Sequence, residues 1–326
     1  MGKIIDMINA AVLAGTPLLF GTLGEILTEK SGNLNLGVEG MMFMGGVSGF
    51  AAAYLYNISA AQQTSGLIAV IFAILGAFAA GALGALIYSF LTVTLRANQN
   101  VTGLTLTIFG TGFGNFFGEH MAISSPGGFA AVDNTVKAAF GAVDIPVLSK
   151  IPYIGKLLFS YNFMVYLSVF TALLLAWFFY RTRYGLNLRA VGENPATADA
   201  AGINVTRYKY IATTIGGGIC GLGGMYVVMV TCSGVWVHNS ISGLGWIAVA
   251  LVIFAAWDPY RALIGSLLFG GLSIMRLYVQ LGIPMQIYDM LPFVGTVIVL
   301  ILTSVRQSRQ RSQPKSCGTN YFREER

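Results

Sequence analysis

Long apolar segments are the feature that most constrains what this chain can fold into. Nine of them follow one another along the sequence, separated by short polar connections. A helix needs about 20 mostly apolar residues to cross the roughly 30 Å hydrocarbon core of a bilayer, and most of the segments reach or approach that length. The predicted spans are residues 5–28, 38–56, 66–95, 100–117, 161–180, 208–232, 241–257, 261–279 and 288–305.

Composition excludes a soluble globule. Hydrophobic residues make up 55% of the 326 residues and charged residues only 10%. The apolar runs are continuous rather than alternating, which favours helices over a membrane β-barrel. Glycines at four-residue intervals, such as Gly45 and Gly49, Gly110 and Gly114, and Gly217 and Gly221, predict faces where helices pack closely. We therefore expect an all-α integral membrane protein of about nine transmembrane helices, within a range of eight to ten.

The distribution of Lys and Arg predicts the orientation of the spans. Cytoplasmic flanks carry an excess of basic residues. If the polar segment 181–207 and the basic tail 306–326 are cytoplasmic, 14 of the 19 Lys and Arg residues lie inside. Residues 1–305 then form a single transmembrane domain with an external N-terminus and a long external loop at 118–160. That loop either receives a partner or simply covers helix ends.

The same orientation makes the first four and last four spans enter the membrane from opposite sides. Two Gly-rich polar stretches, residues 31–37 and 240–245, precede spans in matching positions of these halves. Interrupted segments at equivalent places are typical of the pathway in inverted-repeat transporters. Two ordinary Gly-rich loops are the alternative.

Polar side chains within the predicted spans and at their ends are candidates for lining a solute pathway. Each costs a few kcal/mol in hydrocarbon unless it is paired or faces water. The alternative for Glu39 is an interfacial position at a helix end. Trp236 either forms a lid over a ring-shaped solute or belongs to an aromatic belt at the membrane surface. The candidates are Asn33, Asn35, Glu39, Asn100, Thr102, Asn115, Trp236 and Asn239.

The stretch from Arg181 to Tyr210 is the one long polar interruption in the second half of the chain. Its core, from Glu193 to Gly202, reads as a cap, a proline near the first turn, a short Ala-rich helix and a glycine stop. Such a short helix is marginal alone in water, so it is held between the membrane body and a docked partner, or it is a solvated loop with one helical turn. Arg181, Arg183 and Arg189 are free to contact acidic groups or the phosphates of membrane lipid.

The chain has no GxxxxGK[ST] motif for ATP phosphates, and it has no HExxH or GxSxG motif. If ATP drives transport, another subunit must bind it. The three cysteines, Cys220, Cys232 and Cys317, have no metal-site spacing, and no cofactor or metal is expected in this chain. The basic excess belongs to the cytoplasmic flanks and does not imply nucleic acid.

Two motifs carry a family resemblance that covers nearly the whole chain. They are GEILTEKSGNLNLGVEGMM at Gly24 to Met42 and RAVGENPATADAAGINVTRYK at Arg189 to Lys209. Together they resemble the permease subunit of bacterial ABC importers in the ribose, branched-chain amino acid and nucleoside group. The form GNLNLGVEGMM is more similar to nucleoside or simple-sugar permeases associated with Bmp-type binding lipoproteins than to ribose permeases.

The resemblance implies a fold like that of the vitamin-B12 importer, with inverted halves in the bacterial cytoplasmic membrane. It implies three protein partners: an ABC ATPase, a second permease that is a different chain, and an external substrate-binding lipoprotein. It also implies that a coupling helix seats in the ATPase. The coupling residues would be Gly192, Glu193, Asn194, Pro195, Ala198, Asp199, Ala200 and Gly202.

We therefore expect a permease, not an enzyme, that imports nucleosides by alternating access. A simple sugar or riboflavin is the alternative solute. A different class would be an ion-coupled secondary transporter, in which buried Glu25 and Glu39 carry protons. An intramembrane enzyme is disfavoured, because no paired nucleophile and base is found.

Overall fold

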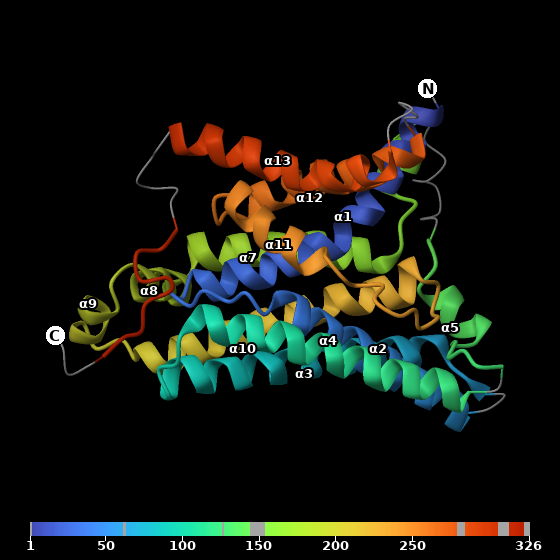
Figure 1. The fold of residues 1–326 in the computed structure, drawn as a ribbon, viewed down its shortest axis with the longest axis horizontal. Helices are drawn as coiled ribbons and strands as arrows, with labels where there is room; N and C mark the ends of the chain where they lie inside the picture. The colour runs from blue at the N-terminus through green and yellow to red at the C-terminus, as the bar shows by residue number, and fades with distance from the viewer. Residues whose placement is uncertain are drawn as a thin grey trace.

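The protein is a bundle of helices (Figure 1). The computed structural model describes residues 2–60, 63–125, 127–143, 154–278, 284–305 and 313–322. Within these ranges the only β-type pairing is an isolated bridge between Ala131 and Val235. The all-α class is therefore confirmed. Residues 144–153 of the predicted external loop, and 306–312 and 323–326 of the predicted tail, lie outside the described residues.

Each predicted span falls on a helix, although the helix within 241–257 has only 11 residues. These helices are α1 (Gly2–Glu29), α2 (Val38–Ala60), α3 (Gly66–Ser89), α4 (Gln99–Ser124), α7 (Phe163–Arg181), α10 (Val205–Tyr226), α11 (Leu244–Phe254), α12 (Pro259–Tyr278) and α13 (Met285–Val305). The ends of α3 and α10 continue as π-helical turns, η2 (Phe90–Thr94) and η3 (Val227–Thr231). Four short helices lie in the connections: α5 (Asn134–Ala139), α6 (Ile154–Leu158), α8 (Arg183–Glu193) and α9 (Pro195–Ala200).

Within the described residues, five helices are long and apolar enough to cross a membrane. They are Lys3–Glu29, Val38–Ala60, Gly66–Thr94, Phe163–Arg181 and Val205–Thr231. Leu244–Phe254 and Pro259–Met275 are apolar but shorter. Several apolar helices of membrane length imply a multi-pass membrane protein, while the count of nine spans stays a prediction.

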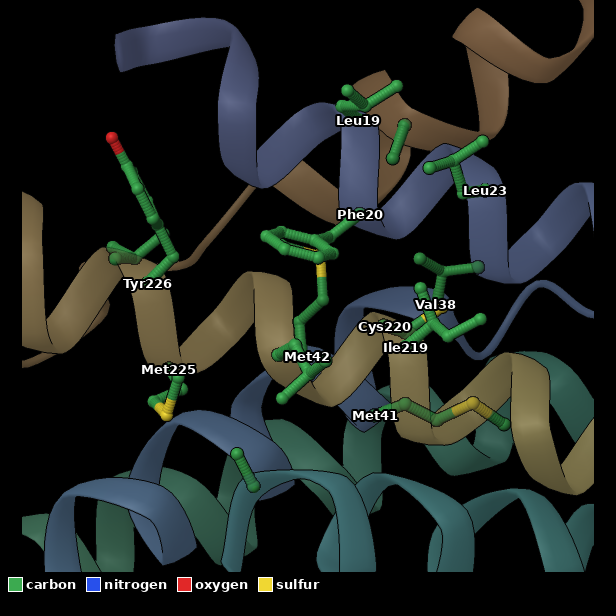
Figure 2. Packing of buried hydrophobic residues seen from close by; sticks show 14 of the residues in the cluster. Leu19, Phe20, Leu23, Val38, Met41, Met42, Ile219, Cys220, Met225 and Tyr226 are labelled. Atoms are coloured by element: carbon green, nitrogen blue, oxygen red, sulfur yellow. The ribbon is translucent and has the colours of Figure 1, made fainter. Parts of the chain in front are cut away.

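Helix α10 lies at the centre of the bundle and packs against α1, α2 and α3. Helix α1 also packs against α12, and α2 against α4. Figure 2 shows Phe20 of α1, Met42 of α2 and Met225 of α10 in one buried cluster. Unbranched methionine side chains suit this cluster because they fill irregular gaps between helices.

Glycines let these central helices touch backbone to backbone. A Cβ atom on Gly45 of α2 would overlap the backbone of Gly221 on α10, and one on Gly224 would overlap the backbone of Met42. Gly217 is equally close to Gly81 of α3. The predicted packing role of the small-residue intervals is confirmed, because no larger side chain fits at these crossings.

This crossing gives a stability prediction. We expect Gly45→Leu to reduce the yield of folded protein severely and to lower its Tm, because the new side chain meets backbone that cannot rotate away. Overpacking a core typically costs about 1–3 kcal/mol. Gly112→Leu on α4 is the control, since a Cβ there meets nothing within 4 Å. Thermal unfolding in detergent measures the difference, and equal Tm values for the two variants would refute the crossing.

Candidate functional site

The local structure predicted for residues 193–202 is confirmed. The Asn194 side chain caps α9 by accepting the N–H of Thr197 at 3.0 Å, and Pro195 occupies the first turn. Beyond the helix, Gly202 has a φ of +83°. The N–H groups of Gly202 and Ile203 donate to the carbonyls of Asp199 and Ala198. This pattern is a Schellman motif. The left-handed conformation of Gly202 turns the chain away from the helix axis and ends the helix, and glycine is the residue that adopts it most easily.

Helices α8 and α9 form a hairpin, and we call residues 183–203 the α8–α9 hairpin. It shares a small hydrophobic core with the start of α10. Val191, Ala198 and Val205 are buried together, with Ile203 and Tyr321 packed against them. This core holds a helix of six residues that would be marginal alone in water.

The eight predicted coupling residues differ in exposure, and two of them, Pro195 and Asp199, are half-buried. Four of them, Glu193, Asn194, Ala200 and Gly202, are exposed, whereas Gly192 and Ala198 are buried. The hairpin lies at the same end of the bundle as the C-terminal segment, away from α5 and the N-terminus (Figure 1). Its outer face is therefore open to a partner in this structure.

The inner side of the hairpin rests on the connection between α1 and α2. A Cβ on Gly192 would overlap the carbonyl of Lys30. Ser316 joins the contact, because its N–H donates to the Gly192 carbonyl at 3.0 Å. Gly32, with a φ of +86°, leaves room for the Ser316 hydroxyl. The hairpin, the α1–α2 connection and the C-terminal segment thus meet at one point.

The α1–α2 connection, residues 30–37, is almost wholly buried, and we call it the α1–α2 junction. Its backbone polar groups bond to side chains from surrounding helices, as irregular backbone away from water requires. The bonds are Asn35 N–H to Glu25 (3.1 Å), Leu34 N–H to Gln99 (2.7 Å), Tyr88 O–H to the Leu34 carbonyl (2.5 Å) and Thr107 O–H to the Leu36 carbonyl (2.8 Å). Helices α1, α3 and α4 are therefore all tied to this loop.

Asn33 and Asn35 are buried within the junction. The side-chain amide of Asn33 donates to the Thr213 hydroxyl of α10 at 3.0 Å, and the side-chain oxygen of Asn35 accepts the Gly37 N–H at 2.9 Å. Both side chains therefore shape the loop in this conformation. Their contact with a solute stays a prediction.

Glu39, in the first turn of α2, contacts the second of the two Gly-rich segments that the sequence places at matching positions. Its side chain is buried in the first turn of α2, and its carboxylate accepts the N–H of Gly243 at 3.0 Å. The N–H groups of Gly245 and Trp246 lie near the same carboxylate. An anionic group at the first N–H groups of α11 is favourable for both capping and the helix dipole. The second Gly-rich segment therefore packs against the start of α2, while the inverted repeat itself stays a prediction.

Asn115 and Asn239 form a reciprocal amide pair at the opposite end of the bundle. The Asn115 amide donates to the Asn239 side chain at 2.7 Å, and the Asn239 N–H donates back to Asn115 at 3.2 Å. Asn239 has a φ of +56°. Asn100 is exposed, whereas the hydroxyl of buried Thr102 returns to the Asn98 carbonyl of its own helix at 2.8 Å. The structure thus brings together only two of these four candidates.

Trp236 is buried rather than standing over an open surface. Its ring fills the space beside Gly118 of α4 and lies 6.4 Å from the ring of Phe50. The Trp236 N–H of the backbone donates to the Ala130 carbonyl at 3.0 Å. In this conformation the ring packs α4 against the loop that follows η3. A lid over a solute stays a prediction.

A row of aromatic side chains on α4 was not predicted from the sequence. Phe109, Phe113 and Phe117 follow at four-residue intervals, with ring centroids 6.1 and 4.6 Å apart. Phe109 and Phe117 are about half exposed, whereas Phe113 between them is partly buried against the main hydrophobic core. The signal was available, since residues four apart on a helix share a face. We call these three residues the α4 aromatic row.

The C-terminal segment also has contacts that the sequence did not predict. Residues 313–322 pack back on the bundle instead of extending as a simple basic tail. The Asn320 amide donates to the Arg96 carbonyl at 2.5 Å, and the Tyr321 hydroxyl donates to Asp199 of α9 at 2.9 Å. Arg96 lies 4.6 Å from the ring centroid of Phe322. We call residues 313–322 the strap, because they join the residues just before α4 to the α8–α9 hairpin.

Comparison with known proteins agrees with this architecture. TsgC13 of Haloferax volcanii, named as a glucose ABC transporter permease, is 34% identical over 96% of this chain and 89% of its own length. The nucleoside ABC transporter permease NupC of Lactococcus lactis subsp. cremoris is 31% identical, over 96% of this chain and 95% of its own length. The guanosine ABC transporter permease NupQ of Bacillus subtilis is 33% identical, over 91% and 92%.

Each of these three organisms also has a second, more distant relative named as a permease of the same kind of transporter, with 22% to 25% identity to this chain. A solved inward-facing structure of a metal-chelate type ABC transporter covers 92% of this chain and 85% of that chain, with 14% identity and a TM-score of 0.43. That likeness is too low to assign the vitamin-B12-importer type of fold, which stays a prediction.

Such relatives are transport subunits, not enzymes, and the ATPase of an ABC transporter is a separate subunit. A family model described as the permease component of the branched-chain amino acid transport system matches residues 7–302, nearly the whole chain. The chain therefore belongs to this family of permease components.

Proposed function

We propose that the chain is the permease subunit of an ATP-driven importer of nucleosides in the bacterial cytoplasmic membrane. The observation that carries the proposal is the α8–α9 hairpin, whose outer face is open and whose inner side rests on the α1–α2 junction. A separate ATPase gripping this hairpin can move the bundle without any nucleotide site in the chain. In this proposal the hairpin is cytoplasmic, residues 1–305 are one permease domain, and ATP binds only to the partner.

The contacts define a route for the movement. Displacing the hairpin shifts Gly192 against the Lys30 carbonyl and so displaces the α1–α2 junction. The junction leads directly into α2, whose Glu39 holds the start of α11. Packed elements of this kind transmit a shift because they are not continuously deformable. We infer that the start of α11 moves together with α2 as the pathway alternates between its two sides.

The α4 aromatic row supports a nucleoside as the solute. A nucleobase offers a flat aromatic face and hydrogen-bonding edges, and aromatic side chains with amides match both. Phe117 lies on α4 close in sequence to Asn115, which is paired with Asn239. Loose stacking on an open row would hold a base weakly enough for release. The names of NupC and NupQ point to the same class of solute.

A simple sugar is the second candidate, because TsgC13 is named as a glucose permease and is as similar to this chain as the other two relatives are. Uptake by the complete importer distinguishes the candidates. We expect labelled guanosine to accumulate, and unlabelled nucleosides but not glucose to compete. Uptake of glucose with no response to nucleosides would reject the nucleoside assignment and keep the permease.

We infer that the pore is completed by a different permease chain. In each of three organisms, one relative is 31% to 34% identical to this chain and another only 22% to 25%. Two diverged permeases in one organism fit a heterodimer better than two copies of one chain. The exposed face of α4 is the part that such a chain would cover.

An external binding lipoprotein would meet the end of the bundle opposite the hairpin. There, residues 127–143 pair with the loop that follows η3, through Val132 N–H to the Gly234 carbonyl at 2.9 Å. His238 and Glu119 form an ion pair nearby, and both are half exposed. This joined surface gives a partner a fixed platform instead of two loose loops.

The reactivity of Cys317 tests whether the strap is docked on the bundle. Burial raises the pKa of the Cys317 thiol, so the docked strap keeps it in the protonated, unreactive form. We expect Asn320→Ala to speed alkylation of Cys317 roughly five- to tenfold, because the loss of its bonds to Arg96 and Ala97, each worth about 1 kcal/mol, frees the strap. Peptide mass spectrometry follows the modified cysteine.

The control for this test is Lys315→Ala, an exposed side chain on the same segment. We expect the control to leave the alkylation rate unchanged. Equal rates in wild type and Asn320→Ala would show that the strap is not held by these contacts.

A further inference from the structure

A polar cavity of about 190 Å³ lies where the end of α1, the end of α7, α8 and the turn before α12 come together. The transport route described above does not use it. Its lining combines three cationic side chains, one carboxylate and three aromatic rings. The lining residues are Lys30, Phe179, Tyr180, Arg189, Ala256, Trp257, Asp258 and Arg261.

None of the three cations forms an ion pair within 4 Å in the part of the chain that the structure describes. The ion pair that the described residues do contain joins His238 and Glu119, which lie far from this cavity in the fold. The Nε of Arg189 is buried without a hydrogen-bond acceptor, and its guanidinium lies 5.8 Å from the ring centroid of Tyr180. A buried polar group without a partner is costly, which points to a missing acceptor.

The acidic groups nearby offset the three positive charges only in part, because Asp258 is the one carboxylate among the residues that line the cavity. Asp258 uses its carboxylate to accept the Tyr260 N–H at 2.9 Å, at the start of α12. Glu29 accepts from the Trp257 ring N–H, and Glu193 is exposed on the hairpin. Burial lowers the pKa of Lys30, and neighbouring Arg189 lowers it further, although Glu193, Asp258 and Glu29 act in the opposite direction. An anion bound in the cavity would favour the charged lysine.

The position of the cavity fits the surface of a bilayer. Lys30 directly follows the candidate span Lys3–Glu29, and Tyr180 is next to the last residue of Phe163–Arg181. The rings of Tyr180 and Tyr260 stack with centroids 6.3 Å apart, and both side chains are about half exposed. Tyrosine, tryptophan and basic residues gather at the level of lipid headgroups, where phosphates are abundant.

We propose that this cavity binds the phosphate of an anionic phospholipid headgroup, with Lys30, Arg189 and Arg261 as its cationic ligands. Guanidinium groups match phosphate oxygens with paired hydrogen bonds. The volume is several times that of a water molecule in the liquid, about 30 Å³, so a phosphate and part of its ester fit. The bound lipid would link the hairpin, through Arg189, to the start of α12, through Arg261.

Native mass spectrometry of the purified importer, extracted from membranes that contain phosphatidylglycerol, tests the proposal. We expect wild type to retain one phosphatidylglycerol that the double variant Arg189→Gln, Arg261→Gln loses, with a drop in occupancy of at least about tenfold. The control is Arg183→Gln, an exposed arginine on the same helix that does not line the cavity. An unchanged Tm for the double variant would show that it is folded.

The readout is lipid retention, so it is independent of whether the proposed solute or transport function is correct. Retention in wild type and control, with loss in the double variant, supports the proposal. Displacement of the lipid by millimolar inorganic phosphate would assign the cavity to free phosphate and overturn the lipid as its source. Equal retention of phosphatidylglycerol by wild type, control and double variant would overturn the site itself. The same conclusion would follow if the double variant lost the ATPase on purification but kept its lipid.

Discussion

Replacing Ala198 with Gln is expected to abolish ATP-driven uptake while leaving the membrane bundle folded. Ala198 is buried in the core of the α8–α9 hairpin with Val191 and Val205. A glutamine there must bury an unpaired amide or push the helix away, at a cost of about 1–3 kcal/mol. A helix of six residues has little stability of its own, so the folded hairpin should fall at least about tenfold in population.

Two measurements separate this effect from general misfolding. Co-purification of the ATPase should be lost in the Ala198→Gln variant, whereas its Tm in detergent should stay close to that of wild type. The control is Ala201→Gln, which places the same side chain at an exposed position just beyond α9. Normal uptake by Ala198→Gln would mean that the hairpin does not couple the bundle to a motor.

The second large effect is expected at Glu39. Replacing it with Leu keeps the volume but removes the acceptor for the first N–H groups of α11. Unsatisfied buried donors cost about 1–3 kcal/mol, and the lost interaction with the helix dipole adds about 0.3–1 kcal/mol. Because Glu39 joins α2 to α11, we expect Glu39→Leu to reduce uptake at least tenfold, even where the protein reaches the membrane.

Glu39→Gln is the informative companion variant, because it keeps nearly the same shape and one acceptor oxygen, while it loses the charge and replaces the second oxygen with an NH2 group. In an ATP-driven importer this variant should retain most of its uptake, measured as the initial rate of guanosine accumulation. In an ion-coupled carrier that uses Glu39 as a proton site, the same variant should lose all gradient-driven uptake. Wild-type uptake that collapses with a protonophore while ATP is maintained would favour the carrier.

The sequence predicts the features of this fold that depend on local chemistry. The cap at Asn194, the proline after it and the stop at Gly202 act within a few residues, so their order is enough to place α9. Apolar length likewise places the long helices, and glycine spacing indicates that the face with Gly45 packs closely against another helix, although only the structure shows that its neighbour is Gly221. These properties need no knowledge of which helices are neighbours.

The candidate pathway was less predictable because its side chains bond across long sequence separations. Asn33 bonds to Thr213, and Glu39 to Gly243, each across more than half of the chain. The sequence does not distinguish a buried polar residue that faces a solute from one that stabilises a loop by hydrogen bonds. The strap was missed for a similar reason, since Tyr321 and Phe322 stand in a polar stretch without periodicity.

The side of the membrane on which the α8–α9 hairpin lies tests the central claim most directly. Thr197→Cys, in a chain whose three cysteines are replaced, puts a thiol on an exposed position of α9 without removing the cap, which uses the backbone N–H. We expect an impermeant maleimide to label it only after cells are permeabilised, and the bound ATPase to protect it. Labelling of Cys at this position in intact cells would contradict the account, because no cytoplasmic motor could then reach the hairpin.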